Sequence, residues 1–154
     1  MTTVLAIDPG AGGALCVYGD TGPLVVSKMP DSETETFRVV HVLAAQSDRI
    51  IIERVHAMPG GGDRKMGASS AFSFGRSFGF LRAAIIATDQ AWEDVAPQTW
   101  QRNLGLGKCA GPDRKRALRE LAKQRFPNFA GITLVTADAM LLGEWAWLKW
   151  RAAV

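Results

Sequence analysis

The sequence contains few residues of the kinds that build disulfide networks or zinc sites. Its two cysteines, Cys16 and Cys109, are too few for an extensive disulfide framework, and their spacing is not that of metal ligands. No apolar run approaches the ~18–20 residues that a helix needs to span a bilayer, so no membrane partner is expected. The first residues lack the basic region and apolar core of a signal peptide, and we therefore expect a cytoplasmic protein.

What the sequence does contain is typical of one globular domain covering residues 1–154, with 47% hydrophobic and 21% charged residues. Residues 1–60 carry seven acidic and four basic side chains, whereas residues 61–154 carry eight acidic and fourteen basic ones. A basic half is typical of a protein that binds a polyanion, although solvated helix faces give the same composition.

The order of apolar runs and turn residues predicts an α/β fold. Strands are expected at 3–8, 13–18, 24–29, 49–55 and 92–96, and helices at 35–47, 69–88, from Pro97, at 112–126 and at 137–152. Glycine-rich loops are expected at 57–67 and 105–111. Three antiparallel strands, followed by two parallel strands that helices separate, predict a mixed five-stranded sheet flanked by helices.

Three acids stand at the ends of apolar elements. Asp8 and Glu53 each follow an apolar strand, and Asp138 opens the last helix. The predicted topology brings them to one end of the sheet, and a divalent metal is the usual reason to place three acids together. Each acid alone also fits a structural role: an Asx turn for Asp8, a salt-bridged strand end for Glu53, or a helix cap for Asp138.

These residues, in this order, resemble the RuvC-type Holliday junction resolvases of the ribonuclease H-like superfamily. The motifs that carry the resemblance are Ile-Asp-Pro-Gly at 7–10, Ile-Glu-Arg-Val-His at 52–56, a Gly-x-x-x-Gly helix at 70–79, Ala-Pro-Gln-Thr-Trp at 96–100, Asp-Arg-Lys-Arg at 113–116 and Ala-Asp-Ala-Met at 137–140. The resemblance covers nearly the whole chain, and a short chain that departs from the bacterial pattern fits a phage-type member.

One position departs from the family pattern. The family generally places an aspartate or histidine three residues before the final aspartate, where this chain has Val135. Thr133 or Thr136 could offer an oxygen without charge, and Glu144 is poorly phased with Asp138 on a helix. The identity of a fourth metal ligand therefore stays open.

The resemblance implies a Mg²⁺-dependent crossover junction endodeoxyribonuclease that resolves Holliday junctions by paired nicks. Phosphodiester hydrolysis is served by two Mg²⁺ ions ~3.5–4 Å apart, with Mn²⁺ expected to substitute. We expect Asp8 to bridge both ions, Glu53 to hold the ion at the leaving group, and Asp138 to hold the ion that activates water. Lys115 is expected to neutralise the scissile phosphate. No small-molecule cofactor is expected.

Basic and planar side chains in the second half of the chain are candidates for contacts with four-way or branched DNA. The candidate DNA-binding residues are His56, Arg64, Lys65, Arg76, Arg114, Lys115, Arg116 and Arg119. His56 could stack on an exposed base or act as a general base. Solvated helix faces and an idle surface loop would explain the same residues without DNA.

A four-way junction has two-fold symmetry, so paired cuts favour a homodimer, and the helix at 69–88 offers an apolar face for it. Three alternatives remain. One is a branched-DNA nuclease of relaxed specificity, and another is a non-catalytic junction-binding protein, which Val135 makes conceivable. An actin-like ATPase would need a second lobe, for which 154 residues leave no room.

Overall fold

The computed structural model describes residues 2–55, 67–106 and 111–152, and its centre is one five-stranded sheet. The strands are β1 Val4–Asp8, β2 Ala14–Gly19, β3 Gly22–Lys28, β4 Arg49–Glu53 and β5 Trp92–Val95, in the spatial order β3-β2-β1-β4-β5. The pairs β1–β2 and β2–β3 are antiparallel, whereas the pairs β1–β4 and β4–β5 are parallel. The predicted mixed sheet is confirmed.

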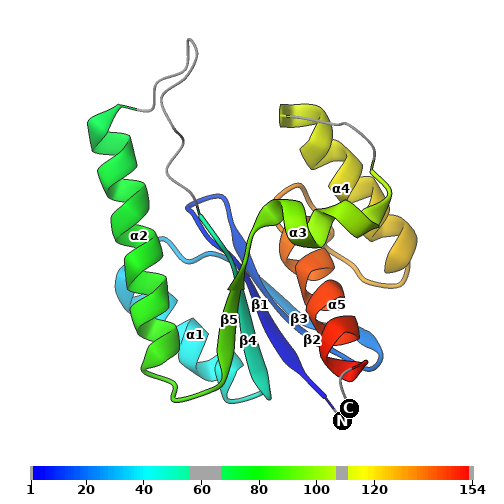
Figure 1. Cartoon of the computed structure of the whole chain (residues 1–154), viewed down its shortest axis with the longest axis horizontal. Coiled ribbons are helices and arrows are strands. Elements are labelled where there is room, and N and C mark those ends of the chain that lie inside the picture. Colours follow the sequence, from blue (N-terminus) through cyan, green and yellow to red (C-terminus); the bar gives the residue numbers. More distant parts are fainter. Residues whose placement is uncertain (1, 56–66, 107–110, 153–154) are drawn as a thin grey trace.

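Helices cover both faces of this sheet. They are α1 Glu33–Ala44, α2 Ala68–Ile86, α3 Pro97–Gln101, the 3-10 helix η1 Arg102–Leu104, α4 Gly111–Arg125 and α5 Ala137–Arg151. Figure 1 shows α1 and α2 on one side of the sheet and α3, α4 and α5 on the other. In the part of the chain that the structure describes, no helix combines the length and apolar character needed to cross a membrane.

The strand predictions differ from the structure mainly at their ends. β3 begins at Gly22, two residues earlier than expected, and includes Pro23. A proline is tolerated there because β3 is an edge strand, where one missing backbone donor does not interrupt the sheet. β4 ends at Glu53, so the acid is the last residue of its strand.

The sheet separates two hydrophobic cores, and alternation along the strands assigns each residue to one of them. Val4 and Ala6 belong to the core under α4 and α5, whereas Leu5 and Ile7 belong to the core under α1 and α2. In β4, Ile51 joins the first core and its two neighbours join the second. Both strands therefore read as continuous apolar runs, as expected for strands covered on both faces.

The same alternation fixes the direction of the acids. Asp8 continues the series of Val4 and Ala6, and Glu53 continues that of Ile51, so both lie on the α5 face. The parallel register pairs Ile7 with Ile52, which brings the two acids that follow to neighbouring strand ends.

Helix α5 packs directly on this face. A Cβ atom built on Gly143 would lie 3.0 Å from the Cβ of Tyr18 and 3.5 Å from that of Ala6, so the glycine permits the close approach of helix and sheet. The indole N–H of Trp147 donates to the backbone oxygen of Thr2 at 3.0 Å, near the start of β1. The opposite end of α5, which carries Asp138, therefore lies toward the ends of β1 and β4.

Candidate active site

Asp8 is a buried carboxylate, 7% exposed, at the end of the central strand β1. The chain turns back into β2 through a tight bend in which the Gly13 N–H donates to the Gly10 oxygen at 3.0 Å. A Cβ atom on Gly13 would lie 2.0 Å from the backbone oxygen of Asp8. Only glycine fits there, because any side chain would displace the backbone that carries the acid.

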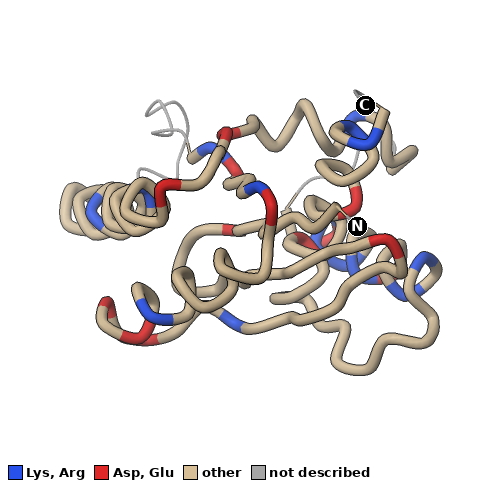
Figure 2. Tube along the Cα trace, turned by 90° about the horizontal axis from the view of Figure 1, so that it is seen from below, with Lys and Arg blue, Asp and Glu red and all other residues tan. Residues whose placement is uncertain are grey.

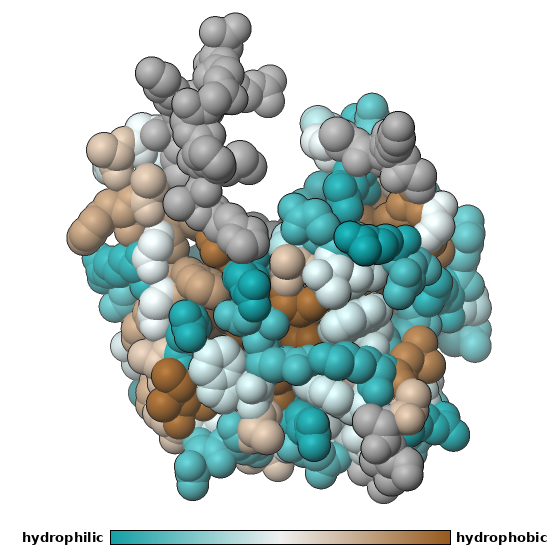
Figure 3. Space-filling model, in the orientation of Figure 1, coloured by the Kyte–Doolittle hydropathy of each residue, from teal (hydrophilic) through white to brown (hydrophobic). Residues whose placement is uncertain are grey.

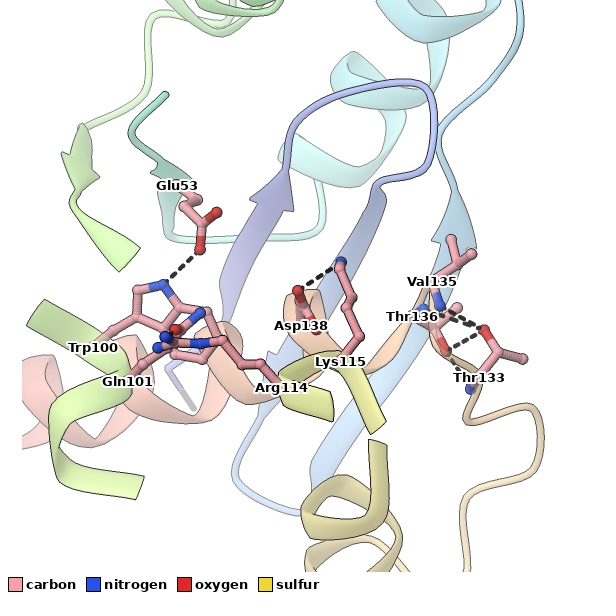
Figure 4. A network of polar contacts seen from close by, with 9 residues as sticks. All are labelled: Glu53, Trp100, Gln101, Arg114, Lys115, Thr133, Val135, Thr136 and Asp138. Carbon is pink, nitrogen blue, oxygen red and sulfur yellow. Dashed lines mark hydrogen bonds and ion pairs between the residues drawn. The ribbon is translucent and has the colours of Figure 1, made fainter. Parts of the chain in front are cut away.

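Glu53, at the end of β4, is held by a tryptophan. The indole N–H of Trp100 in α3 donates to Glu53 Oε2 at 2.8 Å, and Figure 4 shows the two side chains turned toward each other. The Trp100 ring is completely buried in the α5-side core, while Glu53 is half-buried. One of the two carboxylate oxygens of Glu53 is thus engaged by a rigid partner.

Asp138 lies in the first turn of α5 and is 6% exposed. Its Oδ2 accepts a hydrogen bond from Lys115 Nζ of α4 at 2.8 Å (Figure 4). Its Oδ1 is buried and has no hydrogen-bond partner among the described residues. The alternative that Asp138 caps the helix is not supported, because the N-cap residue is Thr136. A buried, unpartnered carboxylate oxygen is costly unless a ligand completes it.

The three acids influence one another electrostatically. The pKa of Asp8 is raised to about 8, chiefly by burial and in addition by the charges of Asp138 and Glu53, while the charge of Lys115 opposes the rise. Burial also raises the pKa of Glu53, against the hydrogen bond from Trp100. The pKa of Lys115 is raised: partial burial opposes this, but the hydrogen bond to Asp138 and the acidic charges outweigh it. Among the described residues, Lys115 acts on all three acids and Arg114 acts on Glu53, so the acids outnumber the cations that act on them.

The donor chemistry of the three acids fits a hard divalent cation, but the acids are not gathered around one point. Within residues 2–55, 67–106 and 111–152, no three histidine, cysteine, aspartate or glutamate side chains form a group that could hold a metal ion. Glu53 is turned to Trp100, and Asp138 to Lys115 (Figure 4). Carboxylates, an unpartnered Asp138 Oδ1, a Glu53 oxygen that Trp100 does not engage and an excess of acids over cations suit Mg²⁺, which Asp138 could accept by releasing Lys115.

The residues considered for a fourth ligand are engaged elsewhere. Val135 packs against the α5-side core. The Thr133 hydroxyl accepts from the Thr136 N–H at 3.2 Å, and the Thr136 hydroxyl accepts from the Thr133 N–H at 2.9 Å, which closes a turn before α5 (Figure 4). Glu144 forms an ion pair with Arg125. None of these side chains extends the acidic site in this arrangement.

Several of the basic candidates form contacts within the chain. Arg76 pairs with Glu33 at 2.7 Å, and Arg116 lies 3.7 Å from Asp113. Arg119 pairs with its neighbour Glu120 at 2.8 Å. Figure 2 shows basic and acidic positions interspersed along much of the trace. Exposed pairs of this kind contribute little to stability, so these arginines can exchange their partners for phosphates at low cost.

Arg114 differs from these three arginines. Its guanidinium donates to the Oε1 of the buried Gln101, which ties the start of α4 to α3 (Figure 4). This contact supports the turn that presents Lys115 to Asp138. The predictions for His56, Arg64 and Lys65 fall outside the described residues.

The sequence alone did not identify Trp100 as the partner of Glu53 or Gln101 as the partner of Arg114. Trp100 lies 47 residues from Glu53, and no local periodicity connects them. The available signal was a large aromatic residue with one hydrogen-bond donor in a short helix directly after a strand of the same sheet.

The sequence matches no protein-family model and no curated protein. Similar solved structures include RuvC of Thermus thermophilus in complex with a Holliday junction substrate, with a TM-score of 0.66 and 16% identity over 99% of this chain and 96% of that chain. The yeast mitochondrial Holliday junction resolvase Ydc2 gives a TM-score of 0.56 and 14% identity over 98% and 79%. The fowlpox virus Holliday junction resolvase gives 0.54 and 10% over 99% and 100%. The chain shares the fold of these proteins, as the resemblance predicted.

Proposed function

We propose that this chain is a metal-dependent endonuclease that resolves Holliday junctions by paired, symmetric nicks. The observation that carries the proposal is the placement of Asp8, Glu53 and Asp138 at one end of the sheet, all on the α5 face. The shared fold with three resolvases supports it, because the similarity spans nearly the whole chain.

The three acids and Lys115 have separate roles in the proposed reaction. Asp8, Glu53 and Asp138 would hold Mg²⁺, which supplies charge stabilisation and a nucleophilic water for phosphodiester hydrolysis. Asp8 is central, since it stands on the middle strand between the other two acids. Lys115 would leave Asp138 when the cation binds, and its ammonium would then be free to neutralise a non-bridging oxygen of the scissile phosphate.

DNA would reach the site across the start of α4. Arg116 and Arg119 are candidates for phosphate contacts because their acidic partners are exposed and easily replaced. Arg114 would act mainly as a brace through Gln101. Arg76 stands on α2, on the other side of the sheet, so a contact from it requires DNA that extends around the molecule.

A homodimer would match the two-fold symmetry of a four-way junction. The first half of α2 is exposed, and Phe72 is 73% exposed in it. Nothing lies within 4 Å of a Cβ built on Gly75 or Gly79, so a second backbone can approach closely there. Figure 3 shows apolar side chains along the α2 side of the molecule.

A non-catalytic junction-binding protein is the second candidate. Val135 at the fourth position and the absence of a three-ligand group among the described residues favour it. It would use the same basic surface but would not need a metal ion. A nuclease of relaxed specificity would share the whole proposed site and differ only in its DNA preference.

The decisive experiment is a nicking assay on end-labelled four-way, three-way and linear DNA, with and without Mg²⁺. We expect paired nicks in the four-way junction that require Mg²⁺. Asp8→Asn should reduce the rate by at least about 100-fold while junction binding survives, because a metal ligand and one negative charge are lost. The matched control is Asp20→Asn, at an exposed turn away from the site, which should cut normally.

Nicking without Mg²⁺, or normal nicking by Asp8→Asn, would contradict the proposed site. Binding without any nicking would support the non-catalytic candidate. Equal cutting of all three substrates would support a nuclease of relaxed specificity.

A further inference from the structure

Trp100 is distinguished by complete burial and by its polar partner. It is 0% exposed in the α5-side core, and its indole N–H donates to Glu53 Oε2 at 2.8 Å. An indole has no other polar atom, so this bond uses its entire hydrogen-bonding capacity. A buried donor that ends on a half-buried carboxylate requires an explanation beyond packing.

The position of Trp100 is fixed by the fold. Glu53 pairs with Val95 at the end of β5, and α3 begins two residues later with Pro97 in its first turn. Proline restricts the backbone at a helix start, and the core encloses the ring. The direction of the N–H is therefore set by the scaffold, and it in turn fixes one oxygen of Glu53 at the end of β4.

In the hydrogen bond between Trp100 and Glu53, the indole can act only as the donor. An indole N–H donates and cannot accept, so it favours the ionised carboxylate of Glu53 and cannot accept a hydrogen bond from a protonated one. It engages Oε2 and leaves Oε1 without the same constraint. Outer contacts of this type orient metal ligands, and their loss typically lowers metal affinity about 10–100-fold.

We propose that Trp100 is a positioning residue, whose N–H holds one oxygen of Glu53 so that the other is presented to a divalent cation. This inference rests on the proposed function, in which Glu53 is a metal ligand. Trp100 itself would not touch the metal or the DNA. Trp100 belongs to α3 and is not one of the three acids that would hold the cation.

The test compares Trp100→Phe with Trp147→Phe. Trp147 is also a buried tryptophan whose N–H makes one hydrogen bond. Its acceptor is the backbone oxygen of Thr2, near the end of α5 that lies away from Asp138. Both variants lose one indole N–H in the same core. We expect similar drops in Tm, whereas the Mn²⁺ affinity, measured by electron paramagnetic resonance, should fall about tenfold or more only in Trp100→Phe.

A second measurement uses the wild-type chain and does not depend on the folding of a variant. In the ¹⁵N–¹H spectrum of the indole groups, Mg²⁺ should shift the Trp100 signal and leave that of Trp147 in place. Glu53→Gln should abolish the Mg²⁺-induced shift. A Trp100 signal that ignores Mg²⁺ in the wild-type chain would overturn the inference.

The Glu53→Gln variant also separates the inference from the proposed function. If Glu53→Gln lowers Mn²⁺ affinity and Trp100→Phe does not, the positioning role is wrong and the proposed site stands. If Glu53→Gln leaves Mn²⁺ affinity unchanged, Glu53 is not a ligand and the proposed site itself is wrong.

Discussion

Asp8 shows how much a single buried carboxylate can cost without a cation. Its pKa of about 8, against an ordinary value of 3.8, means that folding favours its protonated form. Between about pH 4 and pH 8 the folded chain binds a proton that the unfolded chain releases, so the stability of the metal-free protein falls as pH rises through this window. A bound divalent cation would reverse this penalty.

Replacing this carboxylate should therefore stabilise the metal-free protein at alkaline pH. We expect Asp8→Asn in EDTA to have a higher Tm than wild type at pH 8.5. Its free energy of unfolding should be larger by at most about 6 kcal/mol, since a pKa difference of one corresponds to about 1.4 kcal/mol. At pH 4 the two should be alike. Scanning calorimetry across this range, with Asp20→Asn as the control, checks this. Parallel pH profiles for wild type and Asp8→Asn would contradict it.

Individual site residues were predictable where chain order and strand ends define them. Asp8 and Glu53 end their strands, and Asp138 lies in the first turn of α5, as the motifs predicted. The contacts between distant residues were not predictable, because the partners Trp100 and Gln101 belong to a short helix whose orientation depends on the packed core. The local sequence pattern does not indicate which residues far apart in the chain come into contact.

At the scale of elements, the turn between β1 and β2 determines where Asp8 stands. Gly13 occupies a place in which a Cβ would meet the Asp8 backbone oxygen at 2.0 Å, whereas Gly12, one residue earlier, has nothing within 4 Å. Packing therefore requires a glycine at Gly13 but not at Gly12. The expected strands 3–8 and 13–18 locate this turn, but only the packing distinguishes Gly13, where no side chain fits, from Gly12, where one does.

These two positions form a matched pair for substitution. Gly13→Ala should lower the free energy of unfolding by about 2–3 kcal/mol and impair Mg²⁺-dependent nicking, because the backbone at Asp8 must shift. Gly12→Ala should remain within about 0.5 kcal/mol of wild type and keep its activity. Urea denaturation and the nicking assay provide the measurements. Equal effects of the two substitutions would show that the turn tolerates a Cβ at Gly13.

The element order was also predictable, because each apolar run and turn signal is local. The expected strand 49–55 is β4 Arg49–Glu53, and the expected helix 69–88 is α2 Ala68–Ile86. The ends shifted where tertiary pairing decides, as at Pro23 in the edge strand β3. Boundaries depend on neighbours that the sequence pattern does not contain.

At the scale of the whole molecule, the helices on each side of the sheet carry an exposed apolar residue. Phe72 on α2 and Leu148 on α5 are both large, exposed apolar residues, at 73% and 51%, on opposite sides of the sheet. We place the proposed dimer contact on the α2 side, where the open glycines adjoin Phe72.

This placement predicts unequal effects of two similar substitutions. Phe72→Asp should weaken self-association by about 100-fold or more, since it places a charge where the proposed dimer contact would bury an aromatic ring. Leu148→Asp should leave the association unchanged. Sedimentation velocity over a concentration series measures both. A wild-type chain that stays monomeric at every concentration, or equal weakening by both variants, would contradict the proposed contact.

Among the described residues, the buried apolar side chains form two cores, one on each face of the sheet. A volume change beneath α1 or α2 can reach the acids through the sheet or through the turn after β1, where a Cβ on Gly10 would lie 3.6 Å from the Phe74 ring of α2. The sheet therefore separates the side of the proposed dimer contact from the side that carries the acids. We expect substitutions on the α2 side to change the proposed self-association more than they change the acidic site.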